Sequence, residues 1–474
     1  MEIFFILGIP VLLTIAASLF AGRRSFGAVN ALGYLAALSV SVSLLKKTVC
    51  AGANLCFSFI YIDMLSAFFI FVIATIAFAS ALYSIGYIRK DAKKGIISEK
   101  KVKIYYMLFN LFSFSMFLVP SVNNLGMLWV AIEMTTLISA FLVGFYKNKK
   151  SVEAAWKYII ICSVGIIFAL LGTILFSYAF SLLGGVKSLN WSDMIASAAQ
   201  LDKNIVKTAF IFILVGYGTK AGLAPMHTWL PDAHSQAVAP ISALLSGVLL
   251  KTAIYAILRF GMIVISCVGF QFFGNLMILL GLVSLVISGG FILVQKDPKR
   301  LLAYSSIEHV GIISVGFGLG TPLAAAGALL HIFNHAVTKA LMFFGAGNIV
   351  SAYNKHNMNA IRGVIKVLPF TGVMVLLGVF ALTGFPPFSI FVSEIMILIA
   401  AFVKGAYFVA GMLLFFLALV FSAFIYYFGR MIFGNRPRDM AIKKESLSGK
   451  LAFLFLLFQI CAVGLIVPFI KEDL

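Results

Sequence analysis

The sequence predicts an all-α polytopic membrane protein, and three observations support this fold class. Of the 474 residues, 62% are hydrophobic and 11% are charged, and the mean hydropathy is +1.08. Several segments run for about 20 residues without a charge, which is the length that an α-helix needs to cross a bilayer. The charged residues gather in short loops between these segments. A soluble domain of this length does not need so much apolar surface.

Hydropathy predicts about fourteen transmembrane helices. The first, from Ile3, has no basic segment before it and no cleavage site, so we expect a retained span rather than a signal peptide. No linker interrupts the helices, which predicts one membrane domain, 1–474. It divides into helices 1–3 (1–103), two five-helix units (104–262 and 263–433), and a final loop and helix (434–474). The predicted spans are 3–21, 26–45, 63–88, 104–120, 122–145, 154–181, 205–226, 240–260, 270–294, 300–319, 323–351, 364–402, 407–433 and 449–470.

Two of these helices carry a break. The seventh breaks at "KAGLAP", which contains Gly222 and Pro225, and the twelfth breaks at "TGFPPF", which contains Pro386 and Pro387. The two helices are five apart, an odd number, so they cross the membrane in opposite directions. Broken helices in such a pair are typical of an inverted repeat with an ion path at mid-membrane. We therefore predict two inverted five-helix repeats, helices 4–8 and helices 9–13.

Basic residues predict the orientation. About 25 lysines and arginines follow odd-numbered helices and about 8 follow even-numbered ones. The positive-inside rule then places both termini outside the cytoplasm, in a multi-pass protein of the plasma membrane. We expect no nucleic-acid partner despite the net charge of +20, since the basic residues sit in short loops beside the lipids. The main basic positions are Arg23, Arg24, 89–103, Lys147, Lys149, Lys150, Lys296, Lys299, Arg300, Lys355, Arg362, Lys366 and 430–450; the minority are Lys46, Lys47, Lys187, Lys203, Lys207, Arg259, Lys404 and Lys471.

The five cysteines form no CxxC pair, so we expect no Fe–S cluster or zinc site in this chain. Cys50 and Cys56 share one loop and are close enough in sequence for a disulfide. We favour two free thiols there.

Charged and histidine side chains stand inside several predicted helices. A lysine or acid at a helix centre costs about 2.5–3.5 kcal/mol on insertion scales, so structure alone is a poor reason to keep several of them. We interpret them as a path for ion translocation; the alternative is structural pairing or snorkelling. The predicted path consists of Glu133, Lys220, Lys251, His309, His331, His335, Lys339 and Glu394, and Glu308 is a further ionisable residue next to His309.

His331, His335 and Lys339 recur every four residues and therefore share one helix face. The HxxxH spacing also suits zinc, but the lysine would repel a metal and no glutamate lies between the histidines, so we predict a proton relay and no metal. His227, Asp232 and His234 follow the first break. They either line an entrance to the path or are ordinary polar loop residues.

Glu133 and Lys220 suggest a mechanism. Burial lowers the pKa of a lysine and a nearby carboxylate raises it. A pair about 4 Å apart gains about 4 kcal/mol at an effective dielectric of about 20. Moving the carboxylate away can therefore make the lysine release its proton. Lys251, the histidines with Lys339, and Glu394 would be the onward stations, with Glu394 exchanging with the outside.

Four stretches carry a resemblance to a known family: "GLAPMHTWLPDAHSQAVAPISALLSGVLLKTAIYAILR", "KDPKRLLAYSSIEHVGI", "HIFNHAVTKALMFFGAGNI" and "GFPPFSIFVSE". They resemble the antiporter-like subunits of respiratory complex I, membrane-bound [NiFe] hydrogenases and Mrp-type sodium/proton antiporters. The resemblance spans helices 3 to 13 and implies fourteen helices, inverted repeats and ion translocation driven by a redox partner. It implies path roles for Glu133, Lys220, Lys251 and Glu394; the last position is lysine in some members.

"SVEAAWKYIIICSVGIIFALLGTILF" and "YSSIEHVGI" are most similar to the F-type subunit of hydrogenase-4 and its relatives. That likeness implies a non-catalytic subunit, with Fe–S clusters and a NiFe centre in partner subunits, further membrane subunits and a cytoplasmic redox arm. Protons are the expected ion, and sodium is also open. The alternative is a subunit of a secondary Mrp-type Na⁺/H⁺ antiporter that needs no electron donor. A third, more remote, is a scaffold without a working path.

Overall fold

The computed structural model describes residues 2–20, 25–52, 55–57, 59–184, 188–437 and 440–467, and it is almost entirely helical. The all-α prediction is confirmed. Two short strands, β1 (Leu55–Phe57) and β2 (Ile60–Ile62), pair as an antiparallel hairpin. The helices are α1 (Glu2–Phe20), α2 (Phe26–Ala51), α3 (Met64–Lys93), α4 (Glu99–Leu118), α5 (Leu125–Val143), α6 (Lys149–Ser181), α7 (Trp191–Ala196), α8 (Lys203–Ala221), α9 (Trp229–Gln236), α10 (Ala239–Leu244), α11 (Leu250–Val268), α12 (Phe270–Ile292), α13 (Pro298–Leu319), α14 (Pro322–Tyr353), α15 (Val364–Val367), α16 (Pro369–Leu382), α17 (Ser389–Val403), α18 (Tyr407–Ile432) and α19 (Leu447–Ile466).

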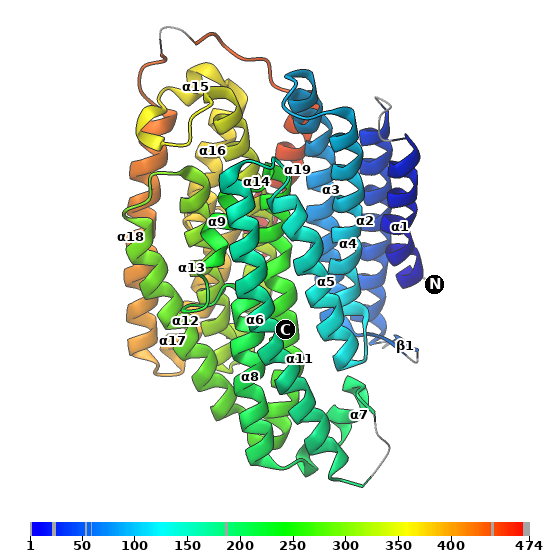
Figure 1. Ribbon diagram of the computed structural model, residues 1–474. Coiled ribbons are helices and arrows are strands. Elements are labelled where there is room, and N and C mark those ends of the chain that lie inside the picture. Colours follow the sequence, from blue (N-terminus) through cyan, green and yellow to red (C-terminus); the bar gives the residue numbers. More distant parts are fainter. Residues whose placement is uncertain are drawn as a thin grey trace.

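The long helices lie side by side in one bundle (Figure 1). Within the described residues, eleven segments are long and apolar enough to cross a membrane. The helices α8 and α14 are not among them, and α16 and α17 are shorter apolar helices on the two sides of a break. Each predicted span contains one of these helices or helix pairs, whereas the count of fourteen and the inverted repeat stay predictions.

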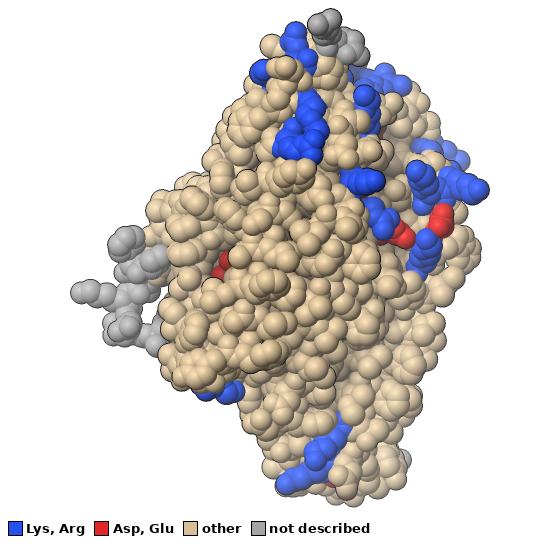
Figure 2. Space-filling view, turned by 90° about the vertical axis from the view of Figure 1, so that its left-hand side faces the viewer, with Lys and Arg blue, Asp and Glu red and all other residues tan. Residues whose placement is uncertain are grey.

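The lysines and arginines gather at one end of the bundle, the upper end in Figures 1 and 2, with smaller groups at the opposite end and an apolar band between them. We call this the basic end; Lys94, Lys299 and Lys443 lie there around one cleft. The hairpin and α7 lie at the opposite end (Figure 1). Arg23, Arg24, Lys187 and Lys471, used in the orientation argument, fall outside the described residues.

Both predicted helix breaks are present. The first helix, α8, ends at Ala221, and Gly222 takes a left-handed conformation (φ 78°) before the chain turns into α9. The second, α16, ends at Leu382, and α17 begins only at Ser389. Glycine adopts positive φ without the steric cost that other residues incur, which explains the stop after α8. The breaks place polar residues deep in the bundle, where an unbroken apolar helix offers none.

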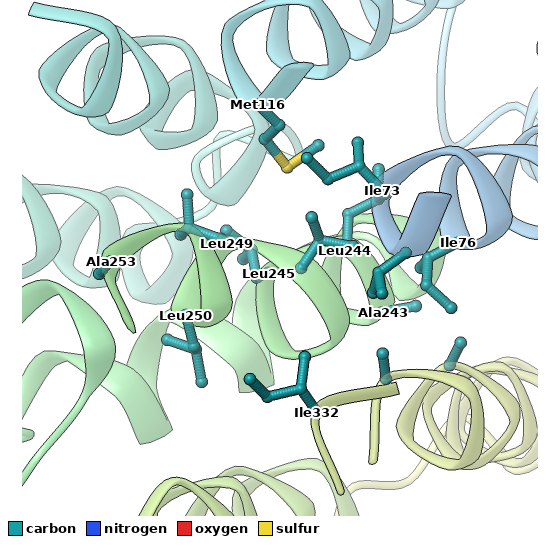
Figure 3. Close-up of a cluster of buried hydrophobic side chains, with 14 of the residues drawn as sticks. Ile73, Ile76, Met116, Ala243, Leu244, Leu245, Leu249, Leu250, Ala253 and Ile332 are labelled. Carbon is teal, nitrogen blue, oxygen red and sulfur yellow. The ribbon is translucent and has the colours of Figure 1, made fainter. Parts of the chain in front are cut away.

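A π turn, η3 (Leu245–Leu249), joins α10 and α11 into one continuous helix that the sequence analysis treated as regular. The turn lies in the apolar core: Leu244, Leu245 and Leu249 stand between Ile73 of α3 and Ile332 of α14 (Figure 3). Single π turns inside α-helices are frequent at functional sites because they change the register of the residues that follow. The first residues that follow here are Leu250 and Lys251.

Two helix pairs pack most closely, α6 with α8 and α12 with α13. A Cβ atom on Gly216 of α8 would lie 2.5 Å from the backbone nitrogen of Ala169 in α6. Gly281 of α12 and Gly311 of α13 stand in the same relation, each Cβ position falling within 2.8 Å of the other residue's carbonyl oxygen. Small residues allow such close approach, which supplies packing energy that the hydrophobic effect does not give between helices in lipid.

Candidate functional site

Lys220 lies at the end of α8, one residue before the break, and its side chain is fully buried. Its ammonium group donates to Thr136 Oγ1 of α5 and to Tyr158 OH of α6, each at 2.7 Å. It also lies 4.9 Å from the centre of the Tyr158 ring, within the range of a cation–π interaction. Tyr158 in turn packs against Trp229, whose indole donates to the Thr219 carbonyl beside the break. The break and α6 therefore hold the lysine in place.

Glu133 does not contact Lys220 directly, contrary to the predicted close pair. Its carboxylate accepts from Thr136 Oγ1 at 3.1 Å and from Ser163 Oγ at 3.0 Å, and no described cation lies within 4.0 Å of it. Thr136 is three residues further along α5, on the same face, and it accepts from Lys220 while it donates to Glu133. The two charges are thus joined through one hydroxyl group.

Lys251 is the second fully buried lysine, on the first turn of α11. Its amino group donates to the Ser246 carbonyl of the π turn at 2.5 Å and lies 2.5 Å from Nδ1 of His335 in α14. The amino group thus has two partners, one from the π turn and one from α14.

His309 and His331 continue from His335. Nδ1 of His309 (α13) lies 2.9 Å from Nε2 of His331 (α14), and Nδ1 of His331 lies 2.9 Å from Ser393 Oγ of α17. The rings of His309 and His335 are 4.6 Å apart. The three predicted histidines thus meet in one buried cluster that joins α13, α14 and α17.

Lys339, Glu308 and Glu394 border this cluster. The ammonium of Lys339 donates to the Leu302 carbonyl at 2.8 Å, and Glu308 lies close enough to interact with it electrostatically. Glu394 lies beside the second break, and a Cβ atom on Gly384 would come within 2.0 Å of its carboxylate oxygen. One oxygen of each buried glutamate has no hydrogen-bond partner in the described part of the chain. Buried polar atoms usually have a partner, so these two oxygens stand out within the cluster.

The carboxylate of Glu394 also lies near His309 and His331: one donor atom from each of the three falls within 4.8 Å of the others. That spacing suits a metal ion as well as a relay. Here His309 and His331 already bond to each other, and the amino group of Lys251 bonds to His335, whose ring centre lies 4.6 Å from that of His309. A protonated lysine repels a cation, so we interpret the group as a hydrogen-bonded relay.

Two of the three predicted loop residues after the first break lie on a helix instead. Asp232 and His234 stand on the short helix α9, and His227 is buried in the turn before it. The carboxylate of Asp232 is already paired with Arg300, and also with Lys157 at 3.3 Å. His234 is fully buried and stacks on Phe343 with ring centres 5.2 Å apart. Of the three, Asp232 is held in ion pairs and His234 is buried against Phe343.

A second ion pair was missed. Arg259 was counted among the loop charges, but it lies within α11, is 3% exposed, and forms a two-point pair with Asp63 at 2.6 and 2.7 Å. Its guanidinium also faces the rings of Tyr255 and Trp191. Burial favours the neutral form of Asp63, but the bonds from Arg259 outweigh it, and the pKa of Asp63 falls below its ordinary value.

Hydroxyl groups are the other functional residues that sequence reasoning missed. The hydroxyl groups of Thr136, Tyr158 and Ser393 each bond to a titratable residue. Ser246 contributes its backbone carbonyl, which accepts from Lys251. Serine and threonine are common in membrane helices, so their presence gives no signal by itself. The usable signal is spacing: Thr136 lies three residues from Glu133, and Ser393 lies next to Glu394.

Four of the five cysteines, Cys50, Cys162, Cys267 and Cys461, are free thiols. The free thiol expected at Cys50 is present. The side chain of Cys56 lies outside the described part of the structure.

Known proteins share this architecture. A family model described as NADH:quinone oxidoreductase/Mrp antiporter, transmembrane, matches residues 122–425, and one for the N-terminus of complex I chain 5 matches residues 51–95. The hydrogenase-4 component F homolog of Methylacidiphilum infernorum is 41% identical over 350 residues, covering 73% of this chain and 74% of that protein.

Two solved structures share the fold. A chain of the archaeal membrane-bound sulfane sulfur reductase matches with a TM-score of 0.87 and 23% identity, and a chain of the Mrp complex from Dietzia sp. matches with 0.86 and 19%. Both alignments cover 98% of this chain and 95% of the other. The family model covers more than half of the chain and includes both helix breaks and every titratable residue of the buried path. The chain therefore belongs to the NADH:quinone oxidoreductase/Mrp antiporter transmembrane family.

Proposed function

We propose that the chain translocates protons across the plasma membrane as the antiporter-like subunit of a redox-driven complex. The observation that carries this proposal is the buried line of titratable groups from Glu133 through Lys220 to the lysine–histidine cluster. Charged side chains inside a membrane domain are expensive and mark ion paths in most cases. A hydroxyl group joins Glu133 to Lys220, and imidazole rings make up the second group with Lys251; hydroxyl and imidazole groups can each accept and donate a proton.

The first step of the mechanism acts on Lys220. Its ammonium donates to two hydroxyl oxygens, those of Thr136 and Tyr158. The Thr136 hydroxyl in turn donates to the Glu133 carboxylate, which therefore stabilises the charged lysine through this hydroxyl. Rotation of the Thr136 hydroxyl or movement of Glu133 weakens the support of the charged form. The lysine then releases its proton into the bundle, toward Lys251.

The second half of the path runs along α14. A proton on Lys251 reaches His335 through the 2.5 Å contact, and the cluster continues through His309 and His331 toward Ser393 and Glu394. Neutral imidazole accepts at one nitrogen and donates at the other, so a row of histidines can pass a proton on without moving far. Glu394, beside the second break, is the proposed exchange point with the outside.

The ion is proposed to be the proton rather than sodium. Sodium needs several oxygen ligands together, whereas the central groups here are three lysines and three histidines. A protonated lysine has no lone pair to offer and repels a cation.

The redox partner is inferred from the hydrogenase-4 relative. By that likeness, the complex holds further membrane subunits and a cytoplasmic arm that carries Fe–S clusters and a NiFe centre. The likeness to the Mrp complex supports the alternative, a secondary Na⁺/H⁺ antiporter subunit without an electron donor.

Extraction of the complex in mild detergent tests the proposal. Nickel and iron analysis of the purified assembly, with identification of its subunits, separates the hydrogenase-like complex from the Mrp-like antiporter. The assembly is then placed in liposomes with a pH dye inside and driven with dithionite-reduced methyl viologen. Acidification of the interior that disappears with a protonophore supports proton translocation. An assembly free of nickel and iron that exchanges sodium for protons supports the alternative.

A further inference from the structure

A cleft of about 670 Å³ opens at the basic end of the bundle, outside the buried path. Its walls come from α3, the α5–α6 loop, the end of α9, the start of α13 and the end of α14, and Lys443 of the segment before α19 closes one side. Most of the charged residues around it are basic: Lys94, Lys299, Lys443 and His356. Asp91 of α3 is the one carboxylate among the residues that line it.

Asp91 is deeply placed, with 4% of its surface exposed. It accepts a hydrogen bond from Tyr146 OH at 2.8 Å, and no described cation lies within 4.0 Å of it. Lys94, Lys90 and Lys299 lie further off, close enough to act on it electrostatically. A buried carboxylate normally has a direct cationic partner or a hydrogen-bond shell, because leaving it unpaired costs free energy. The carboxylate of Asp91 instead lines the cleft, with hydrogen-bond acceptor positions left over after its bond from Tyr146.

The inner wall of the cleft leads to His234. Ser235 and Gln236 line the cleft at the end of α9, and His234 precedes them, fully buried. Neither ring nitrogen of His234 has a hydrogen-bond partner among the described atoms. Buried polar atoms in native structures almost always have a partner, and water is the usual one when protein supplies none.

Three lysines lie close enough to His234 to interact with it electrostatically: Lys299, Lys339 and Lys251. The first lines the cleft, and the other two belong to the buried path. His234 is therefore the titratable side chain between the cleft and the relay. Asp232, in contrast, is held by its ion pairs with Arg300 and Lys157 and is not free to collect protons.

We propose that this cleft is the water-filled mouth of the proton path and that Asp91 is the group that first takes up the proton. A proton from the bulk binds the Asp91 carboxylate and leaves it for water in the cleft. The same water chain protonates His234, which passes a proton to Lys339 or Lys251, and the carboxylate is regenerated. This inference rests on the proposed function, because it names the intake of the same path.

Asp91→Asn tests the inference in the assembled complex. Asparagine keeps an acceptor for Tyr146, so folding and assembly should persist, but it cannot carry a proton. We expect proton uptake to fall several-fold and to fall more steeply than in the wild type as the outer pH rises. A higher concentration of an impermeant zwitterionic buffer should restore much of the loss, because the buffer then delivers protons to the cleft.

Glu99→Gln is the matched control. Glu99 begins α4, six residues after the end of α3, and is exposed outside the cleft, so its loss changes the charge equally without touching the mouth. It should pump like the wild type, and Lys251→Ala should lose pumping without rescue by buffer.

The outcomes separate the two claims. A wild-type complex that moves no protons refutes the proposed function itself. If the wild type pumps and Asp91→Asn pumps equally well, the cleft is not the entrance of the proton path. The same conclusion follows if buffer does not rescue Asp91→Asn at any pH. In both cases the proposed function still stands.

Discussion

Glu133 and Lys220 are linked through the hydroxyl group of Thr136, which donates to the carboxylate at 3.1 Å and accepts from the ammonium at 2.7 Å. A direct ion pair would hold the proton on the lysine with the full attraction of the carboxylate. A hydroxyl bridge is weaker and depends on the rotation of one bond, so a small movement of α5 relative to α8 can break it.

Thr136→Val should therefore uncouple the pair. Valine has nearly the same shape but no hydroxyl, and the buried ammonium loses one of its two acceptors, at a cost of about 1–3 kcal/mol. Proton translocation should fall strongly while the complex still assembles, as judged by subunit composition on a native gel. Thr136→Ser is the control that keeps the hydroxyl, and it should retain most activity. Unchanged pumping by the valine variant would contradict the bridge.

Glu133→Gln and Lys220→Ala should each abolish translocation, and the double variant should be little worse than either. Residues that act as a unit give non-additive effects, whereas independent residues give additive ones. The measurement is the rate of interior acidification in liposomes, with assembly checked for each variant. Full pumping by Lys220→Ala would rule out the switch.

Proton uptake should continue in nominally sodium-free buffer and should be lost in Lys251→Met. Methionine fills a similar volume, but it offers no proton to His335 and no bond to the Ser246 carbonyl. The measurement varies sodium at fixed pH while the interior dye is followed. Strict dependence on sodium, with no pH change, would defeat the assignment of the proton.

The loop between α3 and α4 should face the cytoplasm, because the basic end carries most of the lysines and arginines. A single cysteine placed within residues 94–98 of a Cys-free variant should resist an impermeant thiol reagent added to intact cells and should react after the cells are opened. A cysteine at Ser188, near the opposite end beside α7, is the control and should react from outside. Labelling in the reverse order would overturn the topology.

The Asp63–Arg259 pair should stabilise the end of the bundle opposite the basic end at neutral pH. The pKa of Asp63 is below its ordinary value of 3.8, so the stabilisation is present above that value and is lost as the pH falls through the lower folded pKa. Asp63→Asn should leave Arg259 buried and unpaired, at a cost of about 3–5 kcal/mol. Thermal unfolding of the purified chain at pH 7 measures the loss, and the variant should show a smaller further decrease below pH 4. An unchanged melting temperature at pH 7 would contradict this role.

The fold was largely predictable because apolar length and charge placement constrain a membrane helix so strongly. The breaks at Gly222 and Pro386 were visible because glycine and proline interrupt helices for known steric reasons. The helix α9 was not predicted, because its short polar sequence, Trp229–Gln236, looks like a loop when burial is unknown. The π turn was also missed, since hydropathy does not distinguish helical registers.

The site was predictable as a set of residues but not as a set of contacts. Titratable residues such as Lys220 and Lys251 stand out against an apolar background, and the spacing of His331 and His335 places them on one face. Their partners do not stand out: Thr136 and Ser393 are ordinary membrane-helix residues, and Asp91 lies in a basic stretch that resembles a topology signal. Contacts between distant segments need three-dimensional packing, which one sequence does not contain.

The π turn at Leu245–Leu249 sets the direction, around the helix axis, in which all the following side chains of that helix point. An α-helix turns by about 100° per residue, so one extra residue in a turn offsets the two flanking segments by about that angle. The leucines before and within the turn lie between α3 and α14, and Lys251 just after it also reaches α14, at His335. Removal of one residue from the turn would restore a uniform phase and swing the amine away from the imidazole, although every side chain of the path would still be present. The path thus depends on angular alignment as well as on residue identity.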